Sequence, residues 1–241
     1  MIAFAALVLL ATAASAQQNA SGPPAPALAP EQQAEWSAAE ANQTRISARP
    51  HWISGAFEYP DTERALGHHG AVVIRGLVGV DGKMHYATVQ TSSRAPALDD
   101  NALAFANASV FEPAEDASGA AIAAIASLPV EYYSYTSNEG VGAAMYTCRQ
   151  FVLDMDWWRS AFSDKTLADN RFFLMIRGLG TLARMGQGGA LSVESNESFA
   201  HRWDQAIANC RAHPERRFAQ AIQPEGAMID RMQSNYQNHS H

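Results

Sequence analysis

The pattern of hydrophobic and polar positions is strand-like in the middle of the chain and helical in its last third. Residues 71–80 are rich in β-branched side chains, and residues 83–90 have the same strand-like character. Asp81 and Gly82 separate the two runs. Two strand runs joined by Asp-Gly are a strong hairpin signal, because a type I′ turn needs positive φ at both central residues. The pattern therefore predicts an antiparallel hairpin over 71–90.

Helices are predicted on both sides of this hairpin, and a third strand follows them. A short polar run at 61–66 precedes the hairpin, and apolar residues from Leu98 onward recur at helical spacing. Pro113 ends the second helix, because the residue before a proline is forced out of the α region. Residues 121–133 again read as a strand. The order is helix, hairpin, helix, strand, which predicts a small αββαβ module of the α+β class.

The residues that punctuate this module resemble the C-terminal domain of TonB-family proteins over about 52–134. Ser92-Ser93 and the run Leu128-Pro129-Val130 belong to the resemblance. Its motif positions, for which we expect structural roles, are Tyr59, Pro60, Gly70, Asp81, Gly82, Leu98, Asp99, Ala102, Phe111 and Pro113. One departure is the run 107–110, Asn-Ala-Ser-Val, where family members carry basic and aromatic residues.

The resemblance implies that the module binds protein partners by β-strand addition at an exposed sheet edge. We expect the strand 121–133 to be that edge, because Pro129 lacks an N–H and fits where no ladder donor is needed. The resemblance makes the partner an outer-membrane transporter or another periplasmic protein, and a homodimer is left open. The predicted contact residues along this strand are Ile122, Ile125, Leu128, Pro129, Val130 and Tyr132.

After a polar, glycine-bearing stretch at 133–142, the sequence predicts a helical domain over 143–223. Apolar residues form three stripes at helical spacing, and a fourth helical piece runs through Phe218 and Ile222. We expect the polar tail 224–241 to be disordered. The stripes contain Cys148, Phe151, Val152, Met155 and Trp158; Leu167, Phe172, Ile176, Leu179 and Leu182; and Phe199, Trp203, Ala206, Ile207 and Cys210.

The chain has two cysteines, Cys148 and Cys210, and each lies on an apolar stripe. Two buried thiols are the expectation for a cytosolic protein, whereas export favours a disulfide. Closing a loop of about 60 residues would stabilise the domain by roughly 4 kcal/mol in the chain-entropy model. There is no Cys-x-x-Cys and no histidine set to complete a zinc site. We therefore predict a structural disulfide.

The segments around both cysteines, 146–151 and 207–215, resemble the two ends of the HdeA/HdeB family. Members are small all-helical periplasmic proteins with one disulfide, and some are acid-activated chaperones. The resemblance spans about 145–222. It implies a disulfide-bonded helical module and supplies the alternative hypothesis, an acid or stress chaperone that acts through this domain.

The N-terminal residues predict export. Residues 2–14 are apolar and Ala14-Ser15-Ala16 is a small-x-small cleavage pattern, so residues 1–16 read as a signal peptide. Residues 17–50 are rich in Pro, Ala and Gln and predict a flexible linker, too short for the spacer of a TonB energy transducer. With the TonB resemblance, the expected location is the periplasm of a Gram-negative cell. A start further upstream would instead anchor the protein in the inner membrane.

Charge and residue clustering add no catalytic hypothesis. The net charge of −7 without a basic cluster argues against nucleic acid. His68-His69 reads as a solvated turn, and Asp154 and Asp156 as a solvated helix face. A hydrolase would need a pocket built from residues such as His69, Asp154 and His201, which no motif supports. We expect a non-enzyme without cofactor or metal.

Overall fold

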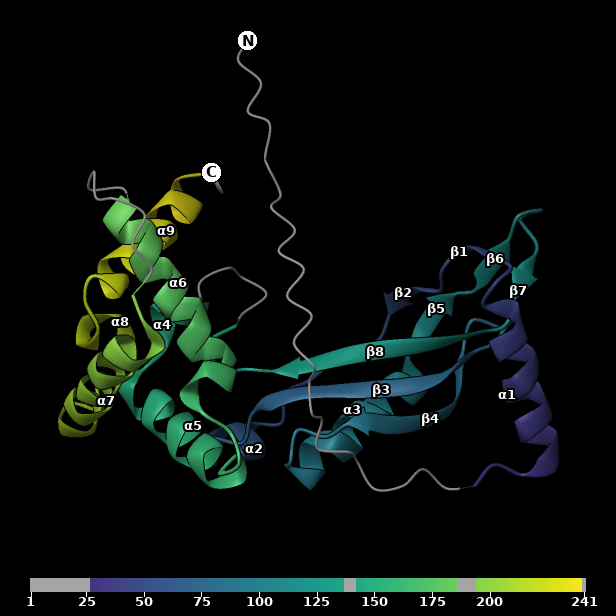
Figure 1. The fold of residues 1–241 in the computed structure, drawn as a ribbon, viewed down its shortest axis with the longest axis horizontal. Coiled ribbons are helices and arrows are strands. Elements are labelled where there is room, and N and C mark those ends of the chain that lie inside the picture. Colours follow the sequence, from purple (N-terminus) through teal and green to yellow (C-terminus); the bar gives the residue numbers. More distant parts are fainter. Residues whose placement is uncertain (1–26, 137–141, 186–193, 240–241) are drawn as a thin grey trace, which may run out of the picture.

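The computed structural model describes residues 27–136, 142–185 and 194–239, which form two lobes (Figure 1). The sheet lobe comprises residues 27–132, and the helical lobe comprises the described residues of 142–239. The predicted signal peptide 1–16 lies outside the described residues. The mixed sheet-and-helix class, with helices after residue 142, is confirmed.

A three-stranded antiparallel sheet forms the centre of the sheet lobe. β3 (Gly70–Val78) pairs with β4 (Met84–Thr91) on one side and with β8 (Ala124–Tyr132) on the other. The strand order β4-β3-β8 leaves β8 at one edge. The predicted hairpin is confirmed, and the predicted third strand is divided into β7 (Ala121–Ile122) and β8.

The turn of the hairpin differs from the predicted type I′. Within the turn, residues 79–83, only Gly82 has a positive φ, which is 71°. The Gly82 N–H donates to the Gly79 carbonyl at 3.1 Å, and the Gly79 N–H donates to the Lys83 carbonyl at 3.0 Å. This is a longer connection that ends with one glycine in the left-handed region. The prediction was wrong because Gly79 and Val80 belong to the turn and not to the strand.

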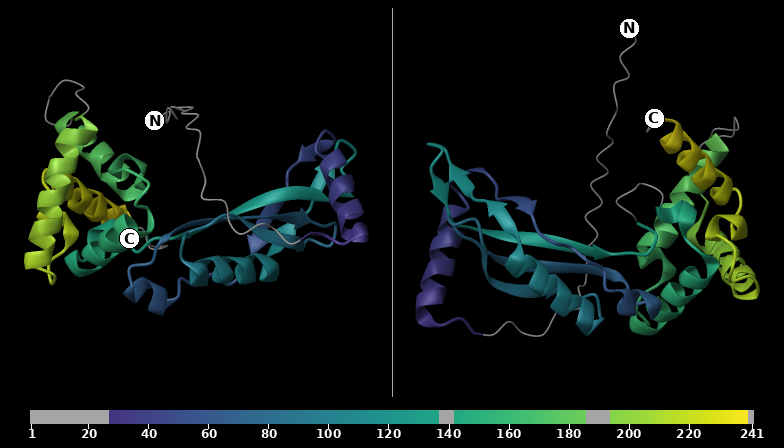
Figure 2. Two further views of the ribbon diagram at one scale, coloured as in Figure 1. Left: turned by 60° about the horizontal axis from the view of Figure 1, so that its bottom comes forward. Right: turned by 180° about the vertical axis from the view of Figure 1, so that it is seen from behind.

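Two helices of the αββαβ order are in place. α2 (Asp61–Ala65) precedes the hairpin, and α3 (Pro96–Ala108) covers one face of the sheet (Figure 2). α3 begins with a proline at its first turn, where the missing N–H is not needed. Its residues Leu98, Ala102 and Ala106 are fully buried against Val72 and Ile74 of β3 and their neighbours.

Short strands extend the sheet lobe away from the helical lobe. β1 (Ile46–Ala48), β6 (Ala114–Asp116) and β7 form one small antiparallel sheet. β2 (His51–Ser54) pairs with β5 (Val110–Glu112). The chain between residues 46 and 54 is therefore tied to the segment that follows α3.

The prediction of a flexible linker over 17–50 is wrong for the described part of that segment. Residues Pro30–Asn42 form α1, which lies at the end of the sheet far from the helical lobe (Figure 1). Ala39 is fully buried, and the Arg75 guanidinium lies 5.3 Å from the Trp36 ring centre. The Tyr86 hydroxyl donates to the Glu35 carboxylate at 2.6 Å. These contacts order a segment whose composition alone is typical of a tether.

The helical lobe is built around the predicted apolar stripes, except that Leu182 of the second stripe is exposed. An aromatic cluster at its centre brings Phe151, Phe172, Trp203 and Phe218 together, with ring centroids 4.4–6.1 Å apart. Its helices are α4 (Gly142–Met145), α5 (Cys148–Ala161), the 3₁₀ turn η1 (Leu167–Asp169), α6 (Arg171–Met185), α7 (Asn196–Ala212), α8 (Phe218–Ala221) and α9 (Glu225–His239).

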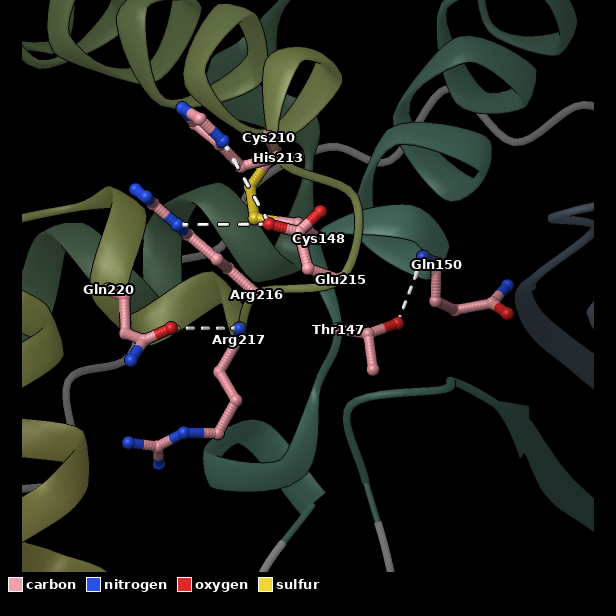
Figure 3. Close-up of a disulfide and its surroundings, with 9 residues drawn as sticks. All are labelled: Thr147, Cys148, Gln150, Cys210, His213, Glu215, Arg216, Arg217 and Gln220. Atoms are coloured by element: carbon pink, nitrogen blue, oxygen red, sulfur yellow. Dashed lines mark hydrogen bonds and ion pairs between the residues drawn. A yellow bond between two sulfur atoms is a disulfide. The ribbon is translucent and has the colours of Figure 1, made fainter.

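A disulfide joins Cys148, the first residue of α5, to Cys210 near the end of α7 (Figure 3). Both cysteines are fully buried. The Cys148 N–H donates to the Arg216 carbonyl at 2.8 Å, so the loop after α7 also holds the start of α5. The predicted pairing is confirmed.

The prediction of a disordered tail over 224–241 is also wrong, because residues Glu225–His239 form α9. The Glu225 side chain is fully buried, and the Arg202 guanidinium donates to its two oxygens at 2.7 and 2.9 Å. Ile229 packs into the helical core. A buried ion pair and one apolar anchor fix a segment that looks polar in sequence.

Candidate partner-binding edge

The outer edge of β8 is the candidate site that the sheet order provides. β8 forms an unbroken ladder of nine residue pairs with β3, from Gly70–Tyr132 to Val78–Ala124. In an antiparallel strand the N–H and C=O of one residue point to the same side, and successive residues alternate between sides. Every second residue of β8 therefore turns its backbone polar groups away from β3.

Contacts with the C-terminal end of α1 identify which residues face outward. The Asn42 side-chain amide donates to the Ala123 carbonyl at 3.0 Å, and the Gln43 amide donates to the Ile125 carbonyl at 3.3 Å. The carbonyls of residues 123 and 125 thus point away from β3. By alternation, the odd-numbered residues Ser127, Pro129 and Glu131 face outward as well.

This orientation explains how β8 accommodates Pro129. Its missing N–H falls on the outer edge, so the ladder with β3 loses no hydrogen bond. Because Asn42 and Gln43 occupy the start of the edge, its open part runs over residues 127–131. It presents N–H donors at Ser127 and Glu131, with carbonyl acceptors at these residues and at Pro129. All three residues are exposed. We call residues 127–131 the open edge.

The side chains of the predicted contact residues are distributed differently from the expectation. Val130 is 3% exposed and Tyr132 is fully buried, and the Tyr132 hydroxyl donates to the Asn101 side chain at 2.7 Å. They face α3 and cannot reach a partner. Ile122 lies in β7, outside the edge strand. Ile125 and Leu128 are half-buried, which leaves Pro129 as the predicted residue that is exposed on the open edge.

The motif positions lie in the frame that holds the sheet. The Phe111 N–H donates to the Gly82 carbonyl at 2.8 Å, and a Cβ on Gly82 would lie 2.5 Å from the Phe111 carbonyl oxygen. The Asp99 carboxylate accepts hydrogen bonds from both Ser92 and Ser93. The remaining motif residues are half-buried or buried, apart from the exposed Asp81: Tyr59, Pro60, Gly70, Leu98, Ala102 and Pro113.

The open edge ends at the helical lobe. The Arg171 guanidinium at the start of α6 pairs with the Glu131 carboxylate and lies 5.1 Å from the centre of the Tyr133 ring. From the other direction, Arg94 of the sheet lobe pairs with Asp164 and donates to the Ala161 carbonyl at 2.7 Å. Each lobe therefore contributes one arginine and one carboxylate to the junction.

The junction also contains His69, which the sequence placed in a solvated turn. That prediction was wrong: His69 is 5% exposed, and its Nδ1–H donates to the Gly67 carbonyl at 2.9 Å. Burial lowers the pKa of His69 to about 4, so the imidazole is neutral at pH 7. The neighbouring His68 is half-buried and lies 2.7 Å from the Glu63 carboxylate.

Asp154 is the second residue that the sequence wrongly assigned to a solvated face. Its side chain is 2% exposed and accepts hydrogen bonds from the Tyr146 hydroxyl and the Gln150 amide, both at 2.6 Å. Gln150 also donates to the Arg64 carbonyl of the sheet lobe at 2.7 Å. Burial raises the pKa of Asp154 to about 7 despite these hydrogen bonds. Asp156, by contrast, pairs with Arg211 at the surface.

Sequence periodicity could not find this junction, because its residues come from a loop, a helix and a strand end that are far apart in the chain. No group of three or more metal-ligating side chains gathers within 27–136, 142–185 and 194–239. In the same ranges no helix is long and apolar enough to cross a membrane. His201 is exposed and lies on α7 in the other lobe from His69.

Comparison with known families bears on the sheet lobe. Residues 56–133 match the family model described as Gram-negative bacterial TonB protein C-terminal. The match covers about a third of the chain and contains α2, β3, β4, α3 and β8. TonB C-terminal domains are non-catalytic protein-interaction domains of Gram-negative envelope proteins, and they bind proteins such as outer-membrane transporters.

No curated protein and no solved structure matches the chain significantly. The comparisons therefore support a relationship for residues 56–133 alone. The resemblance of this segment to the TonB C-terminal domain is confirmed. The comparisons give no support to the HdeA/HdeB resemblance of the helical lobe, which stays a prediction.

Proposed function

We propose that this protein binds a partner protein in the Gram-negative periplasm by adding an extended segment of the partner to the open edge of β8. The observation that carries the proposal is the outward direction of the backbone groups at residues 127–131, beyond the part of the edge held by Asn42 and Gln43. The partner class is an outer-membrane transporter or another periplasmic protein with an extended segment. The TonB C-terminal match supports this class.

Pro129 restricts how a strand can be added. Residues Ser127 and Glu131 each offer a donor and an acceptor, whereas Pro129 offers only its carbonyl. A partner strand can therefore form two backbone hydrogen bonds at Ser127 and two at Glu131, four residues further on. Between them, at Pro129, it can form only one, to the carbonyl. The main-chain bonds supply affinity, and the exposed side chains of the open edge supply selectivity. No catalytic step is part of this proposal.

Export is part of the same proposal. The signal peptide at 1–16 would bring the chain to the periplasm, where a disulfide between Cys148 and Cys210 is favoured. Cell fractionation tests this part separately: the mature chain should be found with periplasmic markers and should begin near Gln17 by N-terminal sequencing. Recovery of the chain in the cytosol with free thiols would contradict it.

Strand addition is tested with two substitutions at one position. Ser127→Pro removes an outward N–H, and Ser127→Ala removes the hydroxyl but keeps the N–H. Fluorescence-polarisation titrations would use synthetic peptides from the periplasm-facing segments of outer-membrane transporters encoded in the same genome. The proposal expects Ser127→Ala to bind like the wild type and Ser127→Pro to bind at least tenfold more weakly. Equal binding by all three proteins would exclude strand addition at this edge.

The alternative function is an acid or stress chaperone that acts through the helical lobe. Its specific support is the buried neutral His69, because acid disfavours burial of a group that gains charge. Opening the junction would expose apolar surface of the helical lobe. An aggregation assay with an acid-denatured client at pH 2–3 tests this function. Suppression of aggregation at this pH, lost in a chain without residues 142–241, would favour the chaperone over a pure binding protein.

A further inference from the structure

A cavity of about 240 Å³ lies where the two lobes meet. The ends of β3 and β4 line it with Ala71 and Thr91, and the connection between the lobes lines it with Tyr133 and Tyr135. The helical lobe lines it with Asn170, the residue before α6, and with aromatic side chains from α5 and α6. The proposed strand addition uses none of these residues.

The paired charges that line this cavity give no reason to expect an ionic ligand. Arg94 pairs with Asp164, and Arg171 pairs with Glu131. The Asp169 carboxylate accepts two hydrogen bonds from the start of its own helical turn, both at 2.9 Å. Each of these charged groups is therefore already satisfied within the protein. Selection of a ligand has to come from neutral polar groups and from the apolar wall.

Asn170 supplies a hydrogen-bond donor to the cavity. It is 3% exposed, and its Oδ1 accepts the Phe173 N–H at 2.9 Å, which caps α6. The other polar atom of the side chain is therefore the amide nitrogen, which has no hydrogen-bond partner among the described residues. It is not one of the unpaired atoms that the described part of the chain closes off from solvent. Since Asn170 lines the cavity and is otherwise buried, this amide reaches solvent through the cavity.

His69 supplies a hydrogen-bond acceptor to the same cavity. Its Nδ1–H donates to the Gly67 carbonyl, so Nε2 of the neutral imidazole is an acceptor. Within 27–136, 142–185 and 194–239, Nε2 has no hydrogen-bond partner and is not closed off from solvent, although His69 is 5% exposed and lines the cavity. Buried polar groups in folded proteins nearly always have a partner, so the unused donor at Asn170 and the unused acceptor at His69 need an explanation.

Aromatic rings form much of the wall of the cavity. Tyr135 and Phe172 are stacked with 4.4 Å between ring centroids, and Trp158 and Phe162 are stacked at 5.8 Å. Flat apolar ligands stack on such rings or meet them edge-on. The volume suits a single-ring molecule, since pockets for drug-sized ligands measure about 300–1,000 Å³.

We infer that this cavity is a binding site for a small neutral aromatic amide. The ligand carbonyl accepts a hydrogen bond from the Asn170 amide, the ligand N–H donates to His69 Nε2, and the ring lies among the aromatic side chains of the wall. A primary amide carries both complements on one planar group, whereas a carboxylate has no donor for His69. The inference does not depend on the proposed strand addition, because it concerns different residues and a different ligand.

Benzamide is the probe, measured by isothermal titration calorimetry with the full mature chain at pH 7.5. Benzoate has the same shape but carries a negative charge and no N–H, and cyclohexanecarboxamide keeps the amide without the aromatic ring. We expect saturable binding of one benzamide per chain, at least tenfold tighter than either comparator. Absence of saturable benzamide binding, or equal binding of either comparator, would overturn the inference.

Three variants locate the site. Asn170→Asp keeps the oxygen that accepts the Phe173 N–H and removes the amide donor, so it should weaken benzamide binding at least fivefold without lowering the melting temperature. Ala71→Leu fills the cavity from β3 and should abolish binding. Asn209→Asp makes the same chemical change at an exposed position of α7 and should bind benzamide like the wild type. Unchanged binding in Asn170→Asp or in Ala71→Leu, or equal weakening in Asn209→Asp, would refute the assignment.

Discussion

The imidazole of His69 lies edge-on against the indole of Trp157, with 5.0 Å between the ring centroids. This contact joins the residue before β3 to α5, and the hydrogen bond from Gln150 to the Arg64 carbonyl joins α5 to α2. The junction thus buries a neutral imidazole and, through Gln150, a carboxyl group at Asp154. Their contributions to the free energy of unfolding change with pH in opposite directions, so each can be tested by a separate prediction.

The first prediction isolates His69 with the variant Asp154→Asn. The folded pKa of His69 is lowered to about 4 from 6.5, so the folded state resists a proton that the unfolded state accepts. Its contribution to stability is therefore present above pH 6.5 and is lost as the pH falls to about 4. The loss amounts to at most about 3 kcal/mol. Urea unfolding of Asp154→Asn at pH 7 and pH 4.5 should show it, and a flat profile would contradict a buried neutral His69.

The second prediction isolates Asp154 with the variant His69→Gln, which keeps a donor for the Gly67 carbonyl. The folded pKa of Asp154 is raised to about 7 from 3.8, so the folded state favours the protonated carboxyl. Its contribution is present below pH 3.8 and is lost as the pH rises through 7. The free energy of unfolding of His69→Gln should rise by up to about 3 kcal/mol between pH 8 and pH 5, measured by the same urea titrations. A loss of stability over this range would contradict the raised pKa.

The third prediction concerns alternation along β8. Ala126 pairs with Gly76 and, by alternation, turns its N–H toward β3. Ala126→Pro should cost about 1–3 kcal/mol of unfolding free energy, because a buried carbonyl of β3 loses its donor. Ser127→Pro should cost less than about 1 kcal/mol, because the N–H it removes faces outward. Equal destabilisation in chemical unfolding would show that the outward set of residues is assigned wrongly.

The fourth prediction concerns the disulfide. The double variant Cys148→Ser/Cys210→Ser opens a loop of 62 residues and should destabilise the helical lobe by roughly 4 kcal/mol. The sheet lobe contains neither cysteine, so it should keep its own unfolding transition. Circular dichroism separates the two, because helical signal would be lost at lower temperature than strand signal. Wild-type protein treated with reductant should behave like the double variant.

The fifth prediction compares two glycines with positive φ. Gly82 has φ +71° and would place a Cβ 2.5 Å from the Phe111 carbonyl oxygen, whereas Gly119 has φ +79° with open space around it. Gly119→Ala should cost about 1–2 kcal/mol for the backbone conformation alone. Gly82→Ala should cost clearly more, because the hairpin turn must also separate from β5. Equal unfolding free energies for the two variants would contradict this close approach.

Periodicity in the sequence predicted the elements whose side chains divide into a buried and an exposed face. The α3 residues Leu98 and Ala102, and the α7 residues Phe199 and Trp203, are buried where their spacing placed them. The turn at Gly82 was found, but its type was not, since the strand-like Val80 belongs to the connection. Local pattern defines elements more reliably than the points at which they end.

The sequence did not predict the elements that depend on one or two distant contacts. α1 is ordered by contacts of Trp36 and Asn42 with the sheet, and α9 by the ion pair between Glu225 and Arg202. Neither helix has a broad apolar stripe, so composition suggested a tether and a tail. His69 and Asp154 were misread for a related reason, because the groups that bury them come from the other lobe or from distant helical residues.

The two arginine–carboxylate pairs at the junction run in opposite directions, Arg94 to Asp164 and Arg171 to Glu131. Such partly exposed pairs add little to the free energy of folding. Their placement nevertheless couples the lobes, because each pair joins a residue of the sheet lobe to a residue of the helical lobe. Two ion pairs of opposite sense therefore hold the lobes against each other, and a rise in ionic strength would weaken both pairs at once.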